Sequence, residues 1–331
     1  MKFEYPGRWT PRHVRLLSED DELDEVFFAD DVVSPSVFRQ LNDVILAKRP
    51  GFAVRFNSYL KTPFDCDWLN HLPSVTSLSL ESIFRFKPPF SLPALRCLKE
   101  IRIDVFDLDD FDFLADLPKC VTSLSLGPTR KKNLSLASLR SLSGLRHLTI
   151  AGQSTDLEAV SALKNLETLR LVSVSSDSLS WISKLKRLRS FGMKLGRFRD
   201  LSDLASLRSL RNLEVVRTAG ICDVSFLADL KSLESLEFAM LPSVRGIPSL
   251  SPLKKLTRVR LENMKGLRSV RTIADATSLE EFVYVLANQF LPSDFSCFLR
   301  HPRLRRVVVG LGNKKRDTEL ESLFAAAGIG T

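Results

Sequence analysis

One histidine of the chain, His147, occupies a position where nucleophilic chemistry could be assembled. Ser123 lies 24 residues before it and Thr168 lies 21 residues after it, so a chain repeating at this interval would align the three side chains on neighbouring strands. A hydroxyl beside a histidine is part of a nucleophile–base pair, but the base also needs a carboxylate to orient it. No carboxylate occupies this line in the adjacent repeats. The spacing therefore predicts no catalytic site.

The other residues capable of such chemistry are scattered. The sequence contains no phosphate-binding loop, no HExxH, no CxxC and no G-x-S-x-G. We therefore expect no enzymatic activity, no cofactor and no metal site. Five cysteines without a framework spacing favour a reducing, cytoplasmic setting, and Cys97 and Cys120 are predicted to stack in the core of adjacent repeats.

A recurring sequence motif, which we call the phrase, positions all these residues. Its clearest copy is LKNLETLRL at residues 163–171, in which leucines three apart give way to leucines two apart. This change predicts a helical or irregular approach followed by an extended strand. The apolar residues that open successive copies lie 21 to 25 residues apart: Val75, Leu98, Val121, Leu145, Leu166, Leu188, Leu210, Leu233, Leu256, Leu279 and Leu304. Two weaker copies, through Phe28 and Phe56, precede them and bring the total to about thirteen strands.

The phrase resembles the leucine-rich repeat family over nearly the whole chain, and its short period is most similar to bacterial repeats of the internalin type. The resemblance implies an α/β solenoid shaped as a horseshoe or arc. Parallel strands would line its concave face, and short helices or irregular segments its convex side. The family usually places asparagine after each strand, but this sequence has Gln153, Val174, Thr218, Leu241 and Met264 there. We therefore expect the turn after each strand to close in a different way.

The two ends of a solenoid need atypical, more polar units, because an end repeat would otherwise expose apolar edges. We expect residues 1–22 to form an N-terminal cap and residues 23–311 to form one continuous solenoid domain. Residues 312–331 are predicted to form a C-terminal capping helix, started by Asp317 or Thr318 and ended by Gly328.

The strongest helical pattern within the solenoid covers residues 34–48. Ser34 is suited to cap this helix and Pro35 to occupy its first turn. Val37, Leu41 and Ile45 form an apolar stripe along one face, so the helix is predicted to pack against the core.

Side chains between the strand leucines are predicted to point onto the concave face. Parallel sheets are normally covered on both faces, so an uncovered face is available to a partner. The middle of this face has small side chains such as Ser125 and Thr149, which leave room for an inserted element. The predicted partner-binding residues are Glu81, Glu100, Arg102, Asp104, His147, Arg170, Lys194, Asn212, Glu214, Glu237, Arg258, Arg260, Glu262, Glu281 and Arg306.

Two connecting stretches combine aromatic and charged residues. They are IFRFKPPF at residues 83–90 and DVFDLDDFDF at residues 104–113. Protein interfaces favour aromatic residues, which makes Phe84, Phe86, Asp109 and Asp110 candidate loop contacts. The alternative is that the phenylalanines fill the convex core and the charges are solvated.

Charge is distributed unevenly along the chain. Residues 1–120 carry 15 Lys/Arg and 20 Asp/Glu, a net charge of −5, whereas the remaining 33 Lys/Arg and 19 Asp/Glu give +14. Such asymmetry steers a partner of matching polarity. No apolar run is long enough to span a membrane, and the N-terminus has no apolar signal core.

These observations favour a protein-binding module over an enzyme. Its partner would be another protein, a toxin or an enzyme, held in the concave face by a cytoplasmic inhibitor or immunity protein that is monomeric alone. A regulatory scaffold for an endogenous enzyme is the first alternative, and the sequence does not separate the two. A nucleic-acid or polyanion binder is the second. It is less favoured, because most basic residues precede the strands and lack interleaved aromatic residues.

Overall fold

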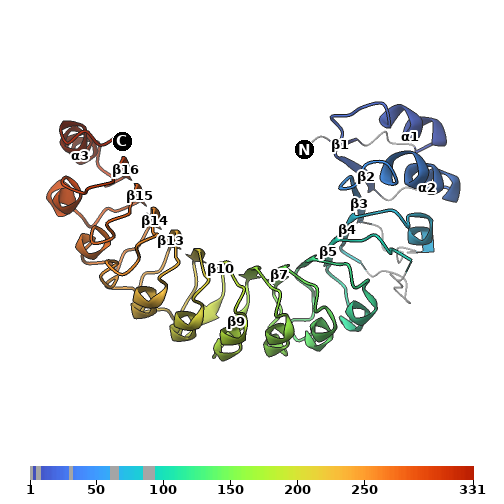
Figure 1. Cartoon of the computed structure of the whole chain (residues 1–331), viewed down its shortest axis with the longest axis horizontal. Helices are drawn as coiled ribbons and strands as arrows, with labels where there is room; N and C mark the ends of the chain where they lie inside the picture. The colour runs from blue at the N-terminus through green and yellow to red at the C-terminus, as the bar shows by residue number, and fades with distance from the viewer. Residues whose placement is uncertain (1–2, 5–8, 30–32, 60–66, 85–93) are drawn as a thin grey trace. The chain divides into compact units, whose positions relative to one another are not determined.

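The computed structural model describes residues 3–4, 9–29, 33–59, 67–84 and 94–331. The chain divides into two compact units, residues 1–165 (unit 1) and residues 166–331 (unit 2). In each unit, parallel strands line one side and short helical turns line the other, as Figure 1 shows. Each unit thus has the predicted leucine-rich repeat solenoid fold.

The strands of unit 1 follow one another in chain order and pair in parallel. They are β1 (Phe3–Glu4), β2 (Glu25–Ala29), β3 (Ala53–Ser58), β4 (Ser77–Ser82), β5 (Glu100–Val105), β6 (Ser123–Leu126) and β7 (His147–Ala151). The sheet starts one strand earlier than the sequence indicated, because β1 pairs with β2 from within the segment predicted to be the cap. The cap and domain boundaries themselves stay predictions.

Unit 1 has two α-helices, α1 (Pro11–Leu17) and α2 (Pro35–Leu41), and a π-helical turn, η1 (Asn42–Leu46), continues α2. Its 3-10 helices are η2 (Asp67–His71), η3 (Asp112–Asp116), η4 (Ala137–Ser141) and η5 (Leu157–Ala162). The predicted helix after Ser34 is therefore present. However, the Ser34 hydroxyl lies 2.7 Å from the Ser36 hydroxyl and does not cap the helix.

Unit 2 repeats the arrangement. Its main strands are β8 (Thr168–Val172), β10 (Ser190–Lys194), β12 (Asn212–Val216), β13 (Ser235–Ala239), β14 (Arg258–Glu262), β15 (Glu281–Val285) and β16 (Arg306–Val309), with a small second sheet of β9 (Ser175–Ser176) and β11 (Arg197–Phe198). The 3-10 helices are η6 (Ser180–Lys184), η7 (Ser202–Ser206), η8 (Ser225–Asp229), η9 (Arg271–Ile273) and η10 (Pro292–Phe298).

Helix α3 (Lys314–Ala326) closes unit 2. It starts earlier than the predicted Asp317 or Thr318, because the Asn313 side chain accepts a hydrogen bond from the Arg316 amide and caps it. Gly328 lies just past its end with a φ of 76°, the left-handed conformation that glycine favours after a helix.

The leucines of the repeat form the core. Each apolar residue that opens a copy of the phrase is buried, from Val75 to Leu304. Within β8, Leu169 and Leu171 are buried whereas Arg170 between them is exposed, as period-two alternation requires. Stacking of adjacent repeats thus removes the leucines from water, which a single repeat could not do.

The N-terminal part of unit 1 has an aromatic core instead of a leucine core. The ring centroids of Trp9 and Phe28 lie 4.3 Å apart, those of Phe28 and Phe56 lie 4.8 Å apart, and those of Phe56 and Trp68 lie 3.6 Å apart. Large rings bury more area per residue than leucine does. The aromatic cluster therefore forms the core of the first repeats, whose sequences match the leucine motif less well.

The turns after β8, β10, β12, β13, β14 and β15 of unit 2 each close through a left-handed residue. Ser173, Leu195, Arg217, Met240, Asn263 and Leu286 directly follow their strands and have φ between 47° and 60°. The amide of Arg217 donates to the Ala239 carbonyl, 2.8 Å away at the end of the next strand, and the amide of Met240 donates likewise to Glu262. Backbone hydrogen bonds thus close these turns without the asparagine that the family usually places after each strand. The turns therefore close in a different way, as expected from the sequence.

The positions that asparagine would occupy are buried. Val174, Leu241 and Met264 there extend the apolar core. Gln153 takes the role of asparagine in unit 1: its amide nitrogen donates to the Lys131 carbonyl (3.2 Å), and its amide oxygen accepts from the Leu134 amide (3.2 Å).

The prediction for two cysteines is wrong. Cys97 and Cys120 are both exposed instead of stacked in the core. Each precedes a buried repeat residue by one position, so it points to the other side of the chain. The Cys120 thiol lies 3.1 Å from the Arg96 carbonyl oxygen, to which it donates.

Candidate functional site

The strands of unit 1 present alternate side chains on a face opposite the core, which we call the open face. Strand register arranges these side chains in rows that cross the strands. The first row is Glu25, Ala53, Ser77, Glu100, Ser123 and His147, and the arginine row is Phe27, Arg55, Ser79, Arg102, Ser125 and Thr149. The third row contains Ala29, Asn57, Glu81 and Asp104. Two acid-bearing rows thus flank a row that carries arginines.

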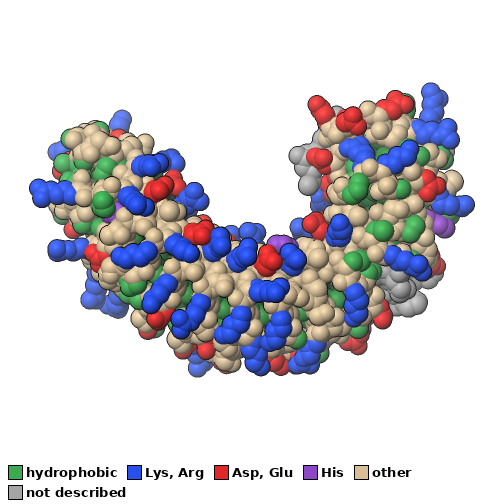
Figure 2. Space-filling view, in the orientation of Figure 1, with side chains coloured by type: hydrophobic (Ala, Val, Ile, Leu, Met, Phe, Trp, Pro, Cys, Tyr) green, Lys and Arg blue, Asp and Glu red, His purple; other side chains and the backbone are tan. Residues whose placement is uncertain are grey.

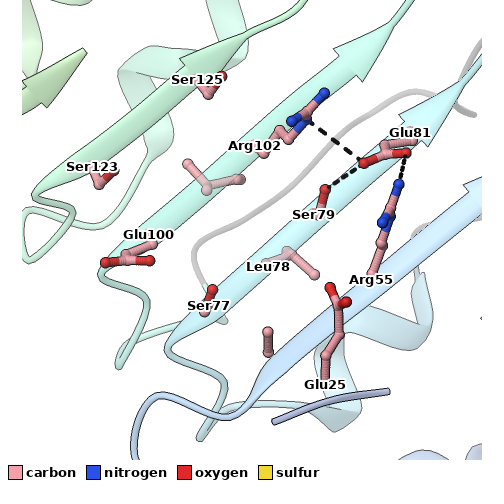
Figure 3. A pocket seen from close by; sticks show the side chains of 12 residues that line it. Glu25, Arg55, Ser77, Leu78, Ser79, Glu81, Glu100, Arg102, Ser123 and Ser125 are labelled. Carbon is pink, nitrogen blue, oxygen red and sulfur yellow. Dashed lines mark hydrogen bonds and ion pairs between the residues drawn. The ribbon is translucent and has the colours of Figure 1, made fainter. Parts of the chain in front are cut away.

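Both arginines are neutralised by the third row. Arg55 Nη2 lies 2.7 Å from Glu81 Oε2 (Figure 3). Arg102 Nη2 lies 2.9 Å from Asp104 Oδ2. Glu81 Oε1 also accepts from the Ser79 hydroxyl at 3.1 Å and lies 3.6 Å from Arg102 Nε. Its hydrogen bond raises the pKa of Arg55 above the ordinary value. Glu81 therefore holds the two arginines in fixed positions.

The first row has no such compensation. Among the described residues, Glu25 and Glu100 form no ion pair and accept no side-chain hydrogen bond, although Glu25 is only 8 % exposed. Burial raises the pKa of the Glu25 carboxyl because loss of water disfavours its charged form; Arg55 opposes the shift and Glu81 adds to it. The Nε of Arg55 is buried and has no partner either.

A hollow of about 280 Å³ lies between these groups. Ala53, Ser77 and Ser79 line its middle, Glu25 and Arg55 line it at one end, and Glu100 and Arg102 line it from β5 (Figure 3). The small side chains leave space above the sheet, nearer the N-terminus than the small residues around Ser125 and Thr149 that the sequence placed in the middle of the face. That space extends from Ser123 and Ser125 towards the N-terminus.

Beside this hollow, Asp104 fills room that the sequence indicated to be empty. A β-carbon placed on Gly127 would lie 2.2 Å from Asp104 Oδ1. The carboxylate therefore leans over the glycine, and Gly127 is needed to accommodate it.

A further row lies where these strands end, and two of its members, Ile83 and Phe106, belong to the connecting stretches singled out in the sequence. Tyr59, Ile83 and Phe106 each directly follow a strand, and the register of Ser58 with Ser82 and of Ser82 with Val105 makes them neighbours. They are 59 %, 46 % and 42 % exposed, and large apolar side chains that are exposed side by side mark interaction sites more often than single ones do. We call them the apolar row. The aromatic and charged residues of the stretch 104–113 already pointed to Phe106, whereas Tyr59 and Ile83 were not named as candidates.

The open face of unit 2 is covered by compensated charges. Lys194 lies 2.6 Å from Glu214, and Glu281 lies between Arg258 (2.9 Å) and Arg306 (3.0 Å). Arg260 lies 3.5 Å from both Glu237 and Glu262. Within residues 166–331, Arg170 is the one cation of this face whose side chain forms no ion pair or hydrogen bond. Asn212 is exposed on β12 of the same face.

Of the four predicted loop contacts, the structure describes three, Phe84, Asp109 and Asp110. Phe84 is half-buried, and Asp109 and Asp110 are exposed, with Asp109 2.7 Å from the Lys131 ammonium. Phe86 lies outside the described residues. The structure thus places the two aspartates in a solvated turn, and Asp109 is already paired.

His147 is exposed at the start of β7 beside Ser123, and among the described residues its imidazole ring makes no hydrogen bond. The described residues contain no group of three or more His, Cys, Asp or Glu side chains that could hold a metal ion. In the same ranges, no helix is both long and apolar enough to cross a bilayer.

Comparison with known proteins places the fold among leucine-rich repeat structures. An internalin of Listeria monocytogenes is similar with a TM-score of 0.63 and 19 % identity, over 91 % of this chain and 88 % of that one. A leucine-rich repeat protein of Leptospira interrogans is similar with a TM-score of 0.52 and 16 % identity, over 95 % and 91 %. Toll-like receptor 13, solved with single-stranded RNA, has a TM-score of 0.57 and 17 % identity, over 92 % of this chain and 49 % of that one.

No protein-family description and no curated protein sequence matches the chain. The comparisons thus show the leucine-rich repeat fold that the sequence pattern indicated.

Proposed function

We propose that this chain is a non-enzymatic module that captures another protein on the open face of its strands. The observation that carries this proposal is the apolar row, Tyr59, Ile83 and Phe106, which adjoins the charged rows of the same face. Protein interfaces combine an apolar centre with a polar rim, and aromatic side chains contribute much of their affinity. A face whose charges served only solubility would have no need for exposed aromatic neighbours.

The form of the function that we favour is a cytoplasmic inhibitor or immunity protein, which holds a toxin or enzyme and blocks it. The four described cysteines are free, which suits a reducing compartment. A regulatory scaffold for an endogenous enzyme would use the same surface. The two forms differ in whether the partner loses its activity when bound.

Nucleic acid suits this surface less well than protein does. Figure 2 shows many Lys and Arg side chains over the turns and 3-10 helices of unit 2. On its open face, however, four of the five cations lie within 3.5 Å of a carboxylate. A phosphate would have to displace those carboxylates, and phosphate contacts supply most of the affinity in nucleic-acid binding.

The test is an affinity pull-down of the tagged full chain from native lysate, at low and moderate salt, with identification by mass. We expect one stoichiometric protein that survives moderate salt and loses its activity on addition of the purified chain. Phe106→Ala should weaken its capture at least tenfold. Leu323→Ala, which truncates another exposed apolar side chain on α3, is the matched control and should leave capture unchanged. Nucleic acid alone, released by salt, would contradict the proposal.

A further inference from the structure

We infer that the first row of unit 1 is a receptor for a basic segment of the partner protein, with one lysine or arginine side chain for each of Glu25 and Glu100. This inference rests on the proposed protein-binding function and specifies the chemistry of the partner. Its starting point is the balance of charge on the open face. Four carboxylates share that face with two guanidinium groups, both of which are paired within the chain.

The arginines form no ion pair with Glu25 or Glu100, because Glu81 and Asp104 hold them on the opposite side; Arg55 acts on Glu25 only from a greater distance. Arg55 Nη2 is 2.7 Å from Glu81, and Arg102 Nη2 is 2.9 Å from Asp104. The acids left without a counter-ion are therefore those of the first row. Figure 3 shows them on either side of Ser77, at the same ends of their strands.

Glu25 gives the strongest indication of a ligand. A carboxylate that is more than nine-tenths buried is normally paired or hydrogen-bonded, since desolvation of an unpaired charge is costly. Glu25 is 8 % exposed, lines the hollow, and has no such partner among the described residues. A cation entering the hollow would supply the missing partner. The burial that raises the pKa of Glu25 would also strengthen its attraction to that cation.

The spacing of the two carboxylates specifies the ligand further. Ala53 and Ser77 lie between them in the register, so three strand spacings of about 4.8 Å separate their backbones, roughly 14 Å in all. One metal ion cannot bridge that distance, since its oxygen ligands lie within about 2.6 Å. An extended segment that crosses the strands presents side chains i and i+4 on one face about 13 Å apart. The expected ligand is therefore a segment with basic residues at i and i+4.

The middle of the row suits such a segment. Ala53 and Ser77 are small, and within the described residues the Ser77 hydroxyl makes no side-chain hydrogen bond. A backbone could therefore approach the sheet closely between the two cationic side chains. Ser77 would remain available as a hydrogen-bonding group for the peptide at position i+2.

The experiment uses a phage-displayed library of random nonapeptides, selected on the immobilised full chain at low salt. We expect retained peptides to be enriched in Lys or Arg pairs at i and i+4. A synthetic peptide of the enriched sequence should bind at least tenfold more weakly to Glu25→Gln and to Glu100→Gln. Asp116→Asn removes one exposed acid from η3 on the other side of the same unit and should change binding less than twofold.

Both glutamine variants keep the shape of the side chain, and their thermal unfolding, followed by circular dichroism, checks that they fold. Retained peptides without basic pairs, or basic peptides bound equally well by all variants, would overturn the inference. If the pull-down partner still binds Glu25→Gln and Glu100→Gln with full affinity, the inference fails while the proposed function stands. Failure of the pull-down to yield any protein would instead count against the proposed function.

Discussion

Glu81 on β4 accepts a hydrogen bond from Arg55 on β3, with 2.7 Å between Oε2 and Nη2. The same carboxylate accepts from Ser79 and lies 3.6 Å from Arg102 on β5. One acid thus joins three adjacent repeats of unit 1 on their open face. Since solenoid stability depends on contacts between neighbouring repeats, this acid contributes to the interfaces on both of its sides.

Glu81→Gln is expected to lower the free energy of unfolding by about 1 kcal/mol, because a charge-assisted hydrogen bond is lost but Arg55 remains partly solvated. The Arg55 side chain is 39 % exposed and the Glu81 side chain 16 %. Chemical denaturation measures the change. Asp104→Asn, which affects the more exposed pair with Arg102, should lower the same free energy by about 0.5 kcal/mol or less. Equal losses for the two variants would contradict a central role for Glu81.

Gly196 lies in a turn of unit 2 that has no room for a side chain. A β-carbon at this position would lie 2.0 Å from the Val174 carbonyl oxygen. Gly196→Ala should therefore destabilise the chain by about 2 kcal/mol or more, since the backbone must shift. Thermal and urea unfolding test this.

Gly246 provides the matched control for that substitution. Nothing lies within 4 Å of its added β-carbon, and its φ is not positive. Gly246→Ala is expected to be neutral or to stabilise by about 0.5 kcal/mol, because it restricts the unfolded chain. A destabilised Gly246→Ala variant would show that space alone does not explain the Gly196 result.

Tyr284 is buried in β15, and burial raises the pKa of its hydroxyl to about 12. The hydroxyl donates to the Met264 carbonyl (3.2 Å) and accepts from Gln289 Nε2 (2.9 Å). Since the folded state retains this proton after the unfolded state has lost it, stability falls as pH rises from about 10 to 12. The contribution is complete below pH 10.

Tyr284→Phe should lower the free energy of unfolding at pH 7 by about 1 kcal/mol through the lost hydrogen bonds. Between pH 10 and 12, the difference from wild type should shrink, because the variant has no phenol to titrate at this position. Urea midpoints across that range measure it. A difference that stays constant with pH would exclude Tyr284 as the titrating group.

Arg217 directly follows β12 with a φ of 47°, and it is exposed. A left-handed conformation costs a non-glycine residue about 1 kcal/mol or more. Arg217→Gly should therefore stabilise unit 2 by roughly 0.5–1 kcal/mol. By contrast, Asn212→Gly, an exposed position within β12, should destabilise it by a similar amount. If both glycines destabilise, the turn is not strained.

The sequence predicted most of the fold because leucine spacing determines both the strand positions and the buried faces. Helix ends were less predictable: the phrase before α3 offers Asn313, Asp317 and Thr318 as caps, and only the fold selects Asn313. The closure of the turns could not be predicted either. Of the six left-handed residues after the strands of unit 2, only Asn263 is a type that favours this conformation.

The sequence also placed the candidate binding residues in their rows, but it did not show which of them matter. Glu25 and Arg55 belong to predicted rows yet were not selected as sites. Their importance depends on Arg55 pairing with Glu81 and not with Glu25, a choice between side-chain conformations. The sequence singled out the stretches that contain Ile83 and Phe106, but not their exposure side by side, which depends on the register of the strands that precede them.

Because the strands pair in parallel and in register, side chains in one row of the open face are separated by whole numbers of strand spacings. Every repeat adds about 4.8 Å along a row and leaves the buried leucines in place. Duplication of one repeat between Glu25 and Glu100 would therefore lengthen their separation by one such step without disturbing the core. A lineage could in this way exchange a ligand with basic residues at i and i+4 for one with a wider interval. The repeat is thus a unit of evolutionary change in specificity as well as a unit of folding.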